Sequence, residues 1–153
     1  MNILYRIEQY TEKYKYKLIE FITEILVEEL GFEMFREPLK DSSFCDNENK
    51  MTWIALNEDD DIIGTITLEE KENLDVFLKK FYVKKECRGK GISKELFNTF
   101  LNFANFKKYE KVFLGTYESL NRAISFYTKN GFEEYNKDTI NNNERHFCLK
   151  LVN

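Results

Sequence analysis

Residues 81–93 read FYVKKECRGKGIS, and they contain the change of structure around which the rest of the chain is organised. Three apolar residues end a strand, a basic turn with two glycines follows, and apolar residues spaced by four then begin a helix. The first N–H groups of a helix have no partner within it, and the helix dipole adds partial positive charge there. Glycine lets the backbone approach an anion closely, so this turn predicts a diphosphate-binding site.

Two better-known phosphate-binding loops do not fit this turn. A Walker loop requires Gly-Lys followed by Ser or Thr, but Lys90 is followed by Gly91. A dinucleotide-binding fingerprint requires a third glycine three residues after Gly91, where this chain has Lys94. From the turn alone, a glycine-containing helix start without any ligand stays open as well.

The segments before and after the turn predict a mixed α/β chain that is mostly antiparallel, with one strand–helix–strand crossover. Apolar and alternating runs predict strands at residues 3–7, 51–56, 62–68, 74–83, 111–117, 132–135 and 146–152. Apolar residues at helical spacing predict helices at residues 11–30, 90–107 and 119–130. The segments 37–50 and 136–145 are expected to be a loop and a turn.

Two motifs carry a resemblance to a known family. Residues 86–91, ECRGKG, resemble the coenzyme A loop of the GCN5-related N-acetyltransferase (GNAT) superfamily, usually Q/R-x-x-G-x-G/A. Residues 121–127, NRAISFY, followed by Gly131-Phe132, resemble its second signature, N-x-x-A-x-x-x-Y and a Gly-Phe pair. The resemblance implies a single α/β domain over residues 1–153. It also implies a mostly antiparallel twisted sheet of about six or seven strands flanked by about four helices.

By this resemblance, the chain transfers an acetyl group from acetyl-CoA to a primary amine by direct attack on the thioester. Backbone groups of the strand before the loop would hold the pantetheine arm; these are Phe81, Tyr82 and Val83. Backbone N–H groups of the turn would hold the diphosphate; these belong to Arg88, Gly89, Lys90, Gly91, Ile92 and Ser93. Asn121 matches an asparagine that contacts the cofactor arm, and Tyr127 matches a tyrosine that acts as general acid near the sulfur. No metal is expected.

Several residues allow more than one interpretation. Tyr127 also lies on an apolar helical stripe, where an aromatic side chain is usually part of the core. Cys87 stands where the family often has an aromatic residue, and it is either a reactive thiol or an inert small residue. The base that deprotonates the amine is open among Glu69, Glu70, Asp75, Glu144 and ordered water. His146 is the only histidine, and we expect it to be a strand residue without a catalytic role.

The charge of the chain is divided between its halves. Residues 1–75 hold 8 basic and 19 acidic side chains, whereas residues 76–153 hold 15 basic and 8 acidic ones. The basic half suits the phosphates of coenzyme A, and no RNA-binding or helix-turn-helix motif supports a nucleic-acid partner. The acidic half suits a cationic amine acceptor.

The remaining expectations concern the setting of the protein. No apolar run is long enough to span a membrane, so we expect a cytoplasmic protein with no membrane partner. Dimers are frequent in the family, so a homodimer is one expected state. A non-catalytic acyl-CoA-binding or regulatory module with the same fold stays open as an alternative.

Overall fold

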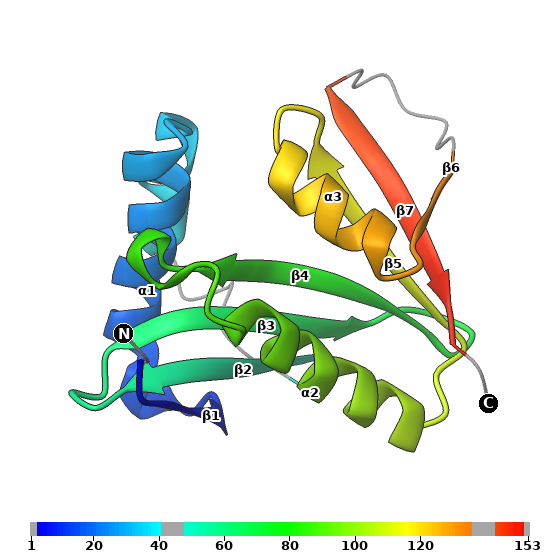
Figure 1. The fold of residues 1–153 in the computed structure, drawn as a ribbon, viewed down its shortest axis with the longest axis horizontal. Helices are drawn as coiled ribbons and strands as arrows, with labels where there is room; N and C mark the ends of the chain where they lie inside the picture. Colours follow the sequence, from blue (N-terminus) through cyan, green and yellow to red (C-terminus); the bar gives the residue numbers. More distant parts are fainter. Residues whose placement is uncertain (1–2, 41–47, 136–142, 152–153) are drawn as a thin grey trace.

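The computed structural model describes residues 3–40, 48–135 and 143–151. Its strands form one seven-stranded sheet in the order β1-β2-β3-β4-β5-β7-β6 (Figure 1). The strands are β1 (Tyr5–Gln9), β2 (Lys50–Asn57), β3 (Ile62–Glu70), β4 (Asp75–Val83), β5 (Lys111–Tyr117), β6 (Glu133–Tyr135) and β7 (Glu144–Lys150). Neighbouring strands are antiparallel except for β4 and β5, which are parallel. The mixed α/β class and the single crossover are therefore confirmed.

Three α-helices pack on the two faces of this sheet: α1 (Lys15–Thr23), α2 (Ile92–Phe106) and α3 (Asn121–Lys129). The larger core lies between the sheet and the helices α2 and α3, with Phe97 and Phe100 fully buried at its centre. A smaller core lies on the other face, where Leu18 and Ile22 of α1 cover β2 and β3. About four helices were expected, and the described residues contain three.

The predicted helix 11–30 changes its hydrogen-bond pattern after α1. Residues Glu24–Glu29 form a π-helical segment, η2, in which the N–H of Leu30 donates to the carbonyl of Ile25 at 3.0 Å. Shorter 3₁₀ segments precede and follow it: η1 (Glu12–Tyr14), η3 (Glu33–Phe35) and η4 (Pro38–Lys40). An apolar stripe is compatible with either helix type, so sequence spacing could not predict the widened turn.

The other predicted elements agree with the structure to within a few residues. Strand β5 has the predicted bounds, β1 begins two residues later than expected, and β7 begins at Glu144 rather than residue 146. Residues 41–47 of the predicted loop and 136–142 of the predicted turn lie outside the described residues. No helix in the described parts of the chain combines the length and the apolar character needed to cross a membrane.

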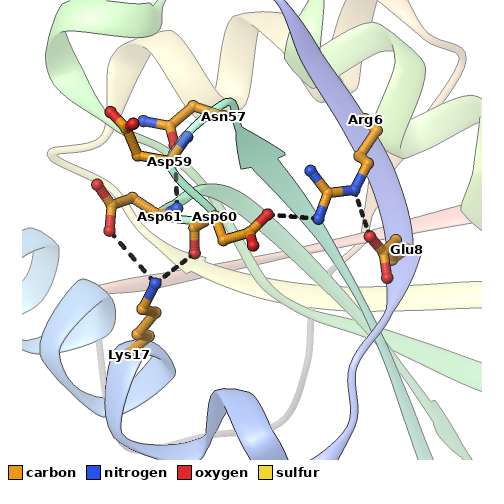
Figure 2. Close-up of polar contacts among 7 residues, drawn as sticks. All are labelled: Arg6, Glu8, Lys17, Asn57, Asp59, Asp60 and Asp61. Carbon is orange, nitrogen blue, oxygen red and sulfur yellow. Dashed lines mark hydrogen bonds and ion pairs between the residues drawn. The ribbon is translucent and has the colours of Figure 1, made fainter.

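The turn between β2 and β3 is tied to the N-terminal elements by charge (Figure 2). The side-chain oxygen of Asn57 accepts hydrogen bonds from the N–H groups of Asp59 and Asp61, each at 2.9 Å. Arg6 of β1 donates to the Asp60 carboxylate at 2.5 Å, which lowers the pKa of that carboxyl. Lys17 of α1 donates to the carbonyl of Asp60 at 2.7 Å. This acidic turn is therefore used to hold α1 against the sheet.

Candidate active site

The site begins where β4 and β5 separate. The two strands pair only at three positions, and the last pair joins Phe77 to Phe113. Beyond this pair the strands diverge, with α3 beside β5 (Figure 1). Parallel strands hold together through their hydrogen-bond ladder, so the early end of the ladder leaves backbone groups of both strands available to a ligand.

A β-bulge near Lys80 changes the direction of the side chains in this part of β4. Lys80 has a positive φ of 49°, and the pairing of β4 with β3 shifts register between Thr65 and Thr67. The hydroxyl of Thr65 donates to the Lys80 carbonyl at 2.7 Å. Because of the inserted residue, Leu78 and Phe81 both face the core under α2. The bulge thus turns the Phe81 ring inward at the point where the strands part.

A first cavity of about 590 Å³ lies on the α3 side of this separation. Its lining comes from the end of β4, the turn after it, the start of α3 and the segment η2. The residues are Ile25, Glu29, Leu30, Phe81, Tyr82, Val83, Arg88, Gly89, Ser93, Ser119, Leu120, Asn121, Arg122, Ala123, Phe126 and Tyr127. A lining of apolar side chains with some polar groups is typical of a site for a small molecule.

The glycine turn places the start of α2 at this cavity. Gly89 and Gly91 have φ values of 78° and 88°, a conformation that residues with a Cβ rarely adopt. The first hydrogen bond of α2 joins the N–H of Glu95 to the carbonyl of Gly91 at 3.1 Å. The N–H groups before Glu95 therefore have no partner within the helix, which is the arrangement that binds anions.

An ion pair connects the turn to η2. Arg88 donates two hydrogen bonds to the carboxylate of Glu29, at 2.6 and 2.8 Å, and a third to the carbonyl of Val83 at 3.0 Å. The two side chains are 20% and 22% exposed, so solvent screens this pair less than a surface pair. Arg88 thus holds the turn, the end of β4 and η2 together.

A second cavity, of about 770 Å³, lies on the other side of the separated strands. Strands β4, β5, β6 and β7 contribute to its lining, together with α1 and residues that follow it, from η2 to η4. It shares four residues with the first cavity: Phe81, Tyr82, Leu120 and Tyr127. The two cavities are therefore adjacent between β4 and β5, with these four residues between them.

A model of the acetyltransferase (GNAT) family matches residues 16–132 of this chain, which include the strand separation and the glycine turn. The chain belongs to the GNAT family. A comparison with curated proteins finds no matching relative.

Solved structures of other acetyltransferases have the same fold as this GNAT protein. A GNAT-family acetyltransferase from Staphylococcus aureus Mu50 is 27% identical with a TM-score of 0.86, covering 97% of this chain and 100% of its own. An acetyltransferase from Streptococcus agalactiae 2603 is 23% identical with a TM-score of 0.81, covering 96% and 98%. The PaiA N-acetyltransferase from Thermoplasma acidophilum, solved with coenzyme A, is 21% identical with a TM-score of 0.71, covering 97% and 100%.

Most of the residues predicted to bind the cofactor line the first cavity. These are Phe81, Tyr82, Val83, Arg88, Gly89, Ser93 and Asn121. Three others, Lys90, Gly91 and Ile92, do not line it, and the side chain of Ile92 is buried in the core. Their predicted contacts use backbone N–H groups at the start of α2, and these contacts stay predictions.

The second motif departs from the family pattern at Asn121. It precedes Ala123 by two positions and Tyr127 by six, whereas N-x-x-A-x-x-x-Y requires three and seven. Leu120 therefore occupies the asparagine position of the pattern, and the residue match for Asn121 was wrong by one position. Asn121 still lines the first cavity, as the first residue of α3, and Leu120 lines both cavities.

Tyr127 belongs to the core and to the site at the same time. Its ring contacts the rings of Phe81, Phe126, Phe132 and Phe147, and only 6% of its surface is exposed. Burial, with a smaller contribution from the neighbouring phenol of Tyr82, raises its pKa far above the usual value. The hydroxyl therefore stays protonated at neutral pH and is available as a hydrogen-bond donor where the cavities meet.

The four carboxylates considered as bases lie in different places. Glu69 pairs with Lys79, and Glu70 accepts a hydrogen bond from Tyr109 at 2.6 Å. Asp75 begins β4, at the end of the strand away from the glycine turn. Among the described residues, Glu144 is the only one of the four that lines the second cavity.

Cys87 shows the features of an inert residue rather than a reactive one. Its side chain is buried, with 7% exposed, and desolvation raises the pKa of its thiol. A raised thiol pKa decreases the thiolate fraction at neutral pH, which lowers the reactivity of the group.

Sequence reasoning missed the contribution of the N-terminal helical segment to the first cavity. Ile25, Glu29 and Leu30 line the first cavity, whereas Ile22 and Leu26 line the second. A π-helical turn rotates successive side chains differently from an α-helix, and such turns are frequent at functional sites. The only sequence signal was an acidic pair at residues 28–29 inside an otherwise apolar stripe.

Proposed function

We propose that this GNAT protein is an N-acetyltransferase that transfers the acetyl group of acetyl-CoA to a primary amine. The observation that carries the proposal is the pair of cavities that meet at Phe81, Tyr82, Leu120 and Tyr127. One cavity would receive the cofactor arm, and the other would receive the acceptor. The structural neighbour PaiA, an N-acetyltransferase solved with coenzyme A, supports this assignment.

The first cavity has the features that acetyl-CoA requires. The free N–H groups at the start of α2, with the left-handed glycines before them, suit a diphosphate. The apolar part of the lining and the unpaired edge of β4 suit a pantetheine arm, which offers amide groups to a strand. Acetyl-CoA supplies an acetyl group already activated as a thioester.

The residues of the chain would then perform two tasks at the junction. Backbone N–H groups of β4 near Phe81 would donate to the thioester oxygen, where negative charge develops during acyl transfer. The hydroxyl of Tyr127 would donate to the sulfur. A thiol has a pKa of about 8.5, below that of the buried phenol, so complete proton transfer from Tyr127 is uphill on its own. Tyr127 would therefore donate its proton only as it receives another one.

The second candidate function is a non-catalytic acyl-CoA-binding module, which would need only the first cavity to bind its ligand. The larger second cavity, lined by the same four residues, favours the enzyme because it provides a place for an acceptor.

The experiment measures binding and turnover separately. Coenzyme A should raise the melting temperature of the protein, and free thiol should appear when acetyl-CoA is mixed with an amine acceptor. Tyr127→Phe should lower kcat at least about 100-fold while it leaves the dissociation constant of acetyl-CoA within a few-fold. Binding without turnover on any amine would support the non-catalytic reading, and absence of binding would refute both.

A further inference from the structure

The only histidine of the chain occupies an unusual place in the second cavity. His146 is 8% exposed, and it lines this cavity from β7. Its Nε2 atom is buried and has no hydrogen-bond partner among the described residues; the Glu144 carboxylate lies 3.7 Å away. A buried polar atom without a partner costs about 1–3 kcal/mol, and a residue with such an atom in a cavity lining is a candidate to bind a ligand or take part in its reaction.

The neighbouring strands hold the imidazole in this position. Gly115 of β5 lies directly opposite His146 in the sheet. A Cβ atom at Gly115 would lie 3.1 Å from Nδ1 and 3.2 Å from Cε1 of the ring, so the missing side chain makes room for the imidazole. Tyr135 of β6 is on its other side, with the two ring centroids 6.0 Å apart.

The other residues that line the second cavity indicate which kind of acceptor molecule it suits. The cavity is lined mainly by aromatic and aliphatic side chains, which include Phe32, Phe35, Phe77, Tyr117 and Tyr135. Glu144 is the single carboxylate among the described lining residues. A polyamine or an aminoglycoside would bring several ammonium groups out of water, and this lining offers a partner for one. Aromatic rings suit an apolar body and one ammonium.

We propose that His146 is the group that deprotonates the acceptor, an inference that rests on the proposed acetyl transfer. The acceptor is then a primary monoamine with an aromatic or branched apolar body. Nε2 takes one proton from the ammonium, and Glu144 stabilises the resulting imidazolium. The freed lone pair forms the N–C bond to the acetyl carbon, and the C–S bond breaks with its electron pair on sulfur. The second proton leaves nitrogen and replaces the one that Tyr127 gives to sulfur. His146 later releases its proton to water.

Other ionisable groups face the same cavity and enter the interpretation of a pH profile. The ones that line it besides His146 and Glu144 are Lys79, Lys80, Tyr82, Tyr117, Tyr127 and Tyr135. Lys79 pairs with Glu69 and lies over the Phe77 ring, so its charge is compensated. The two tyrosines whose pKa is raised most in this cavity, Tyr82 and Tyr127, keep their protons through the pH range of the test.

The test compares His146→Gln with Arg145→Gln, a neighbour on β7 that lines neither cavity. With 2-phenylethylamine as acceptor, His146→Gln should lower kcat about 100-fold at pH 7, with the melting-temperature shift by coenzyme A unchanged. The variant's kcat/KM should then rise about tenfold per pH unit up to the pKa of the free amine, near 10, whereas the wild type reaches its plateau earlier. Arg145→Gln should behave as the wild type does.

A second measurement needs no variant. Because the chain has one histidine, the imidazole ¹⁵N resonances of untagged protein can be assigned to His146 directly. They should shift when 2-phenylethylamine is added to the protein with coenzyme A, and not when spermidine is added. Unchanged resonances, a wild-type pH profile in His146→Gln, or acetylation of spermidine in preference to 2-phenylethylamine would overturn the inference. In the last case the N-acetyltransferase proposal would stand, whereas absence of coenzyme A binding would refute that proposal itself.

Discussion

Replacing Arg88 by alanine tests whether the glycine turn depends on its ion pair with η2. The substitution removes two hydrogen bonds to Glu29, at 2.6 and 2.8 Å, and one to the carbonyl of Val83 at 3.0 Å. Hydrogen bonds to charged groups contribute about 1.5–3 kcal/mol when buried, and exposed ion pairs contribute about 0–1 kcal/mol. The side chains are about one-fifth exposed, so we expect a loss toward the lower end of the buried range, about 2 kcal/mol.

For a chain of this length, 1 kcal/mol changes the melting temperature by about 3 °C, so Arg88→Ala should lower it by about 6 °C. The matched control is Arg145→Ala, which also breaks a two-contact pair, with Glu134 at 2.7 Å in both contacts, between side chains 38% and 42% exposed. That pair is a surface pair, and its loss should lower the melting temperature by about 3 °C or less.

The same substitution should weaken coenzyme A binding for an electrostatic reason. Without Arg88, the Glu29 carboxylate stays unpaired in the cavity where the diphosphate would bind, and like charges repel. A loss of about 1.4 kcal/mol would raise the dissociation constant tenfold. The double variant Arg88→Ala with Glu29→Gln removes the carboxylate and should recover most of this affinity, measured by titration calorimetry.

The opposite result would refute this reasoning. If Arg88 contacts the diphosphate directly, Glu29→Gln alone should strengthen binding by releasing the guanidinium, and the double variant should bind as weakly as Arg88→Ala. Equal melting temperatures of Arg88→Ala and Arg145→Ala would contradict the structural role of the pair.

Two further predictions concern the turn and the alkaline limit. Gly91→Val forces valine into a φ of 88°, which costs about 1–2 kcal/mol of conformational energy, although its Cβ would meet nothing within 4 Å. Titration calorimetry should therefore show weaker coenzyme A binding. An unchanged affinity would show that binding does not depend on the geometry of this turn. Burial raises the pKa of Tyr82 from 10.0 to about 12. Between these pH values the Tyr82 hydroxyl is deprotonated in the unfolded chain but still protonated in the folded protein. Stability should therefore be complete below pH 10 and fall as pH rises toward 12. Urea unfolding at pH 9 and 11 should show a smaller fall for Tyr82→Phe than for the wild type, and an equal fall would contradict the assignment.

The part of the fold around residues 81–93 could be predicted because its signals are local. A strand, a turn that needs positive φ at glycine, and a helix with apolar spacing of four each follow from adjacent residues. The same holds for β5, whose predicted bounds the structure confirms. These local signals predicted residues that line the first cavity.

The second cavity could not be predicted because it is made by contacts between distant segments. His146 was correctly placed in a strand, but its place in this cavity depends on facing Gly115 across the β5–β7 pair and on Tyr135 of β6. No local pattern in the sequence indicates which residue lies opposite a histidine. The π-helical form of η2 and the pairing of Glu29 with Arg88 were missed for the same reason, since 59 residues separate the partners.

Several acidic residues of the first half form ion pairs that join elements of the fold. In the described residues, Asp60 pairs with Arg6, Glu29 with Arg88 and Glu69 with Lys79, so these charges join elements to one another. None of these three carboxylates lines the second cavity. An acceptor would consequently be selected there by the shape and aromatic character of the lining and by one histidine–carboxylate pair. The net charge of a half-chain describes only the general electrostatic surroundings of a site. The separation of β4 and β5 after Phe77 determines which side chains would face a substrate.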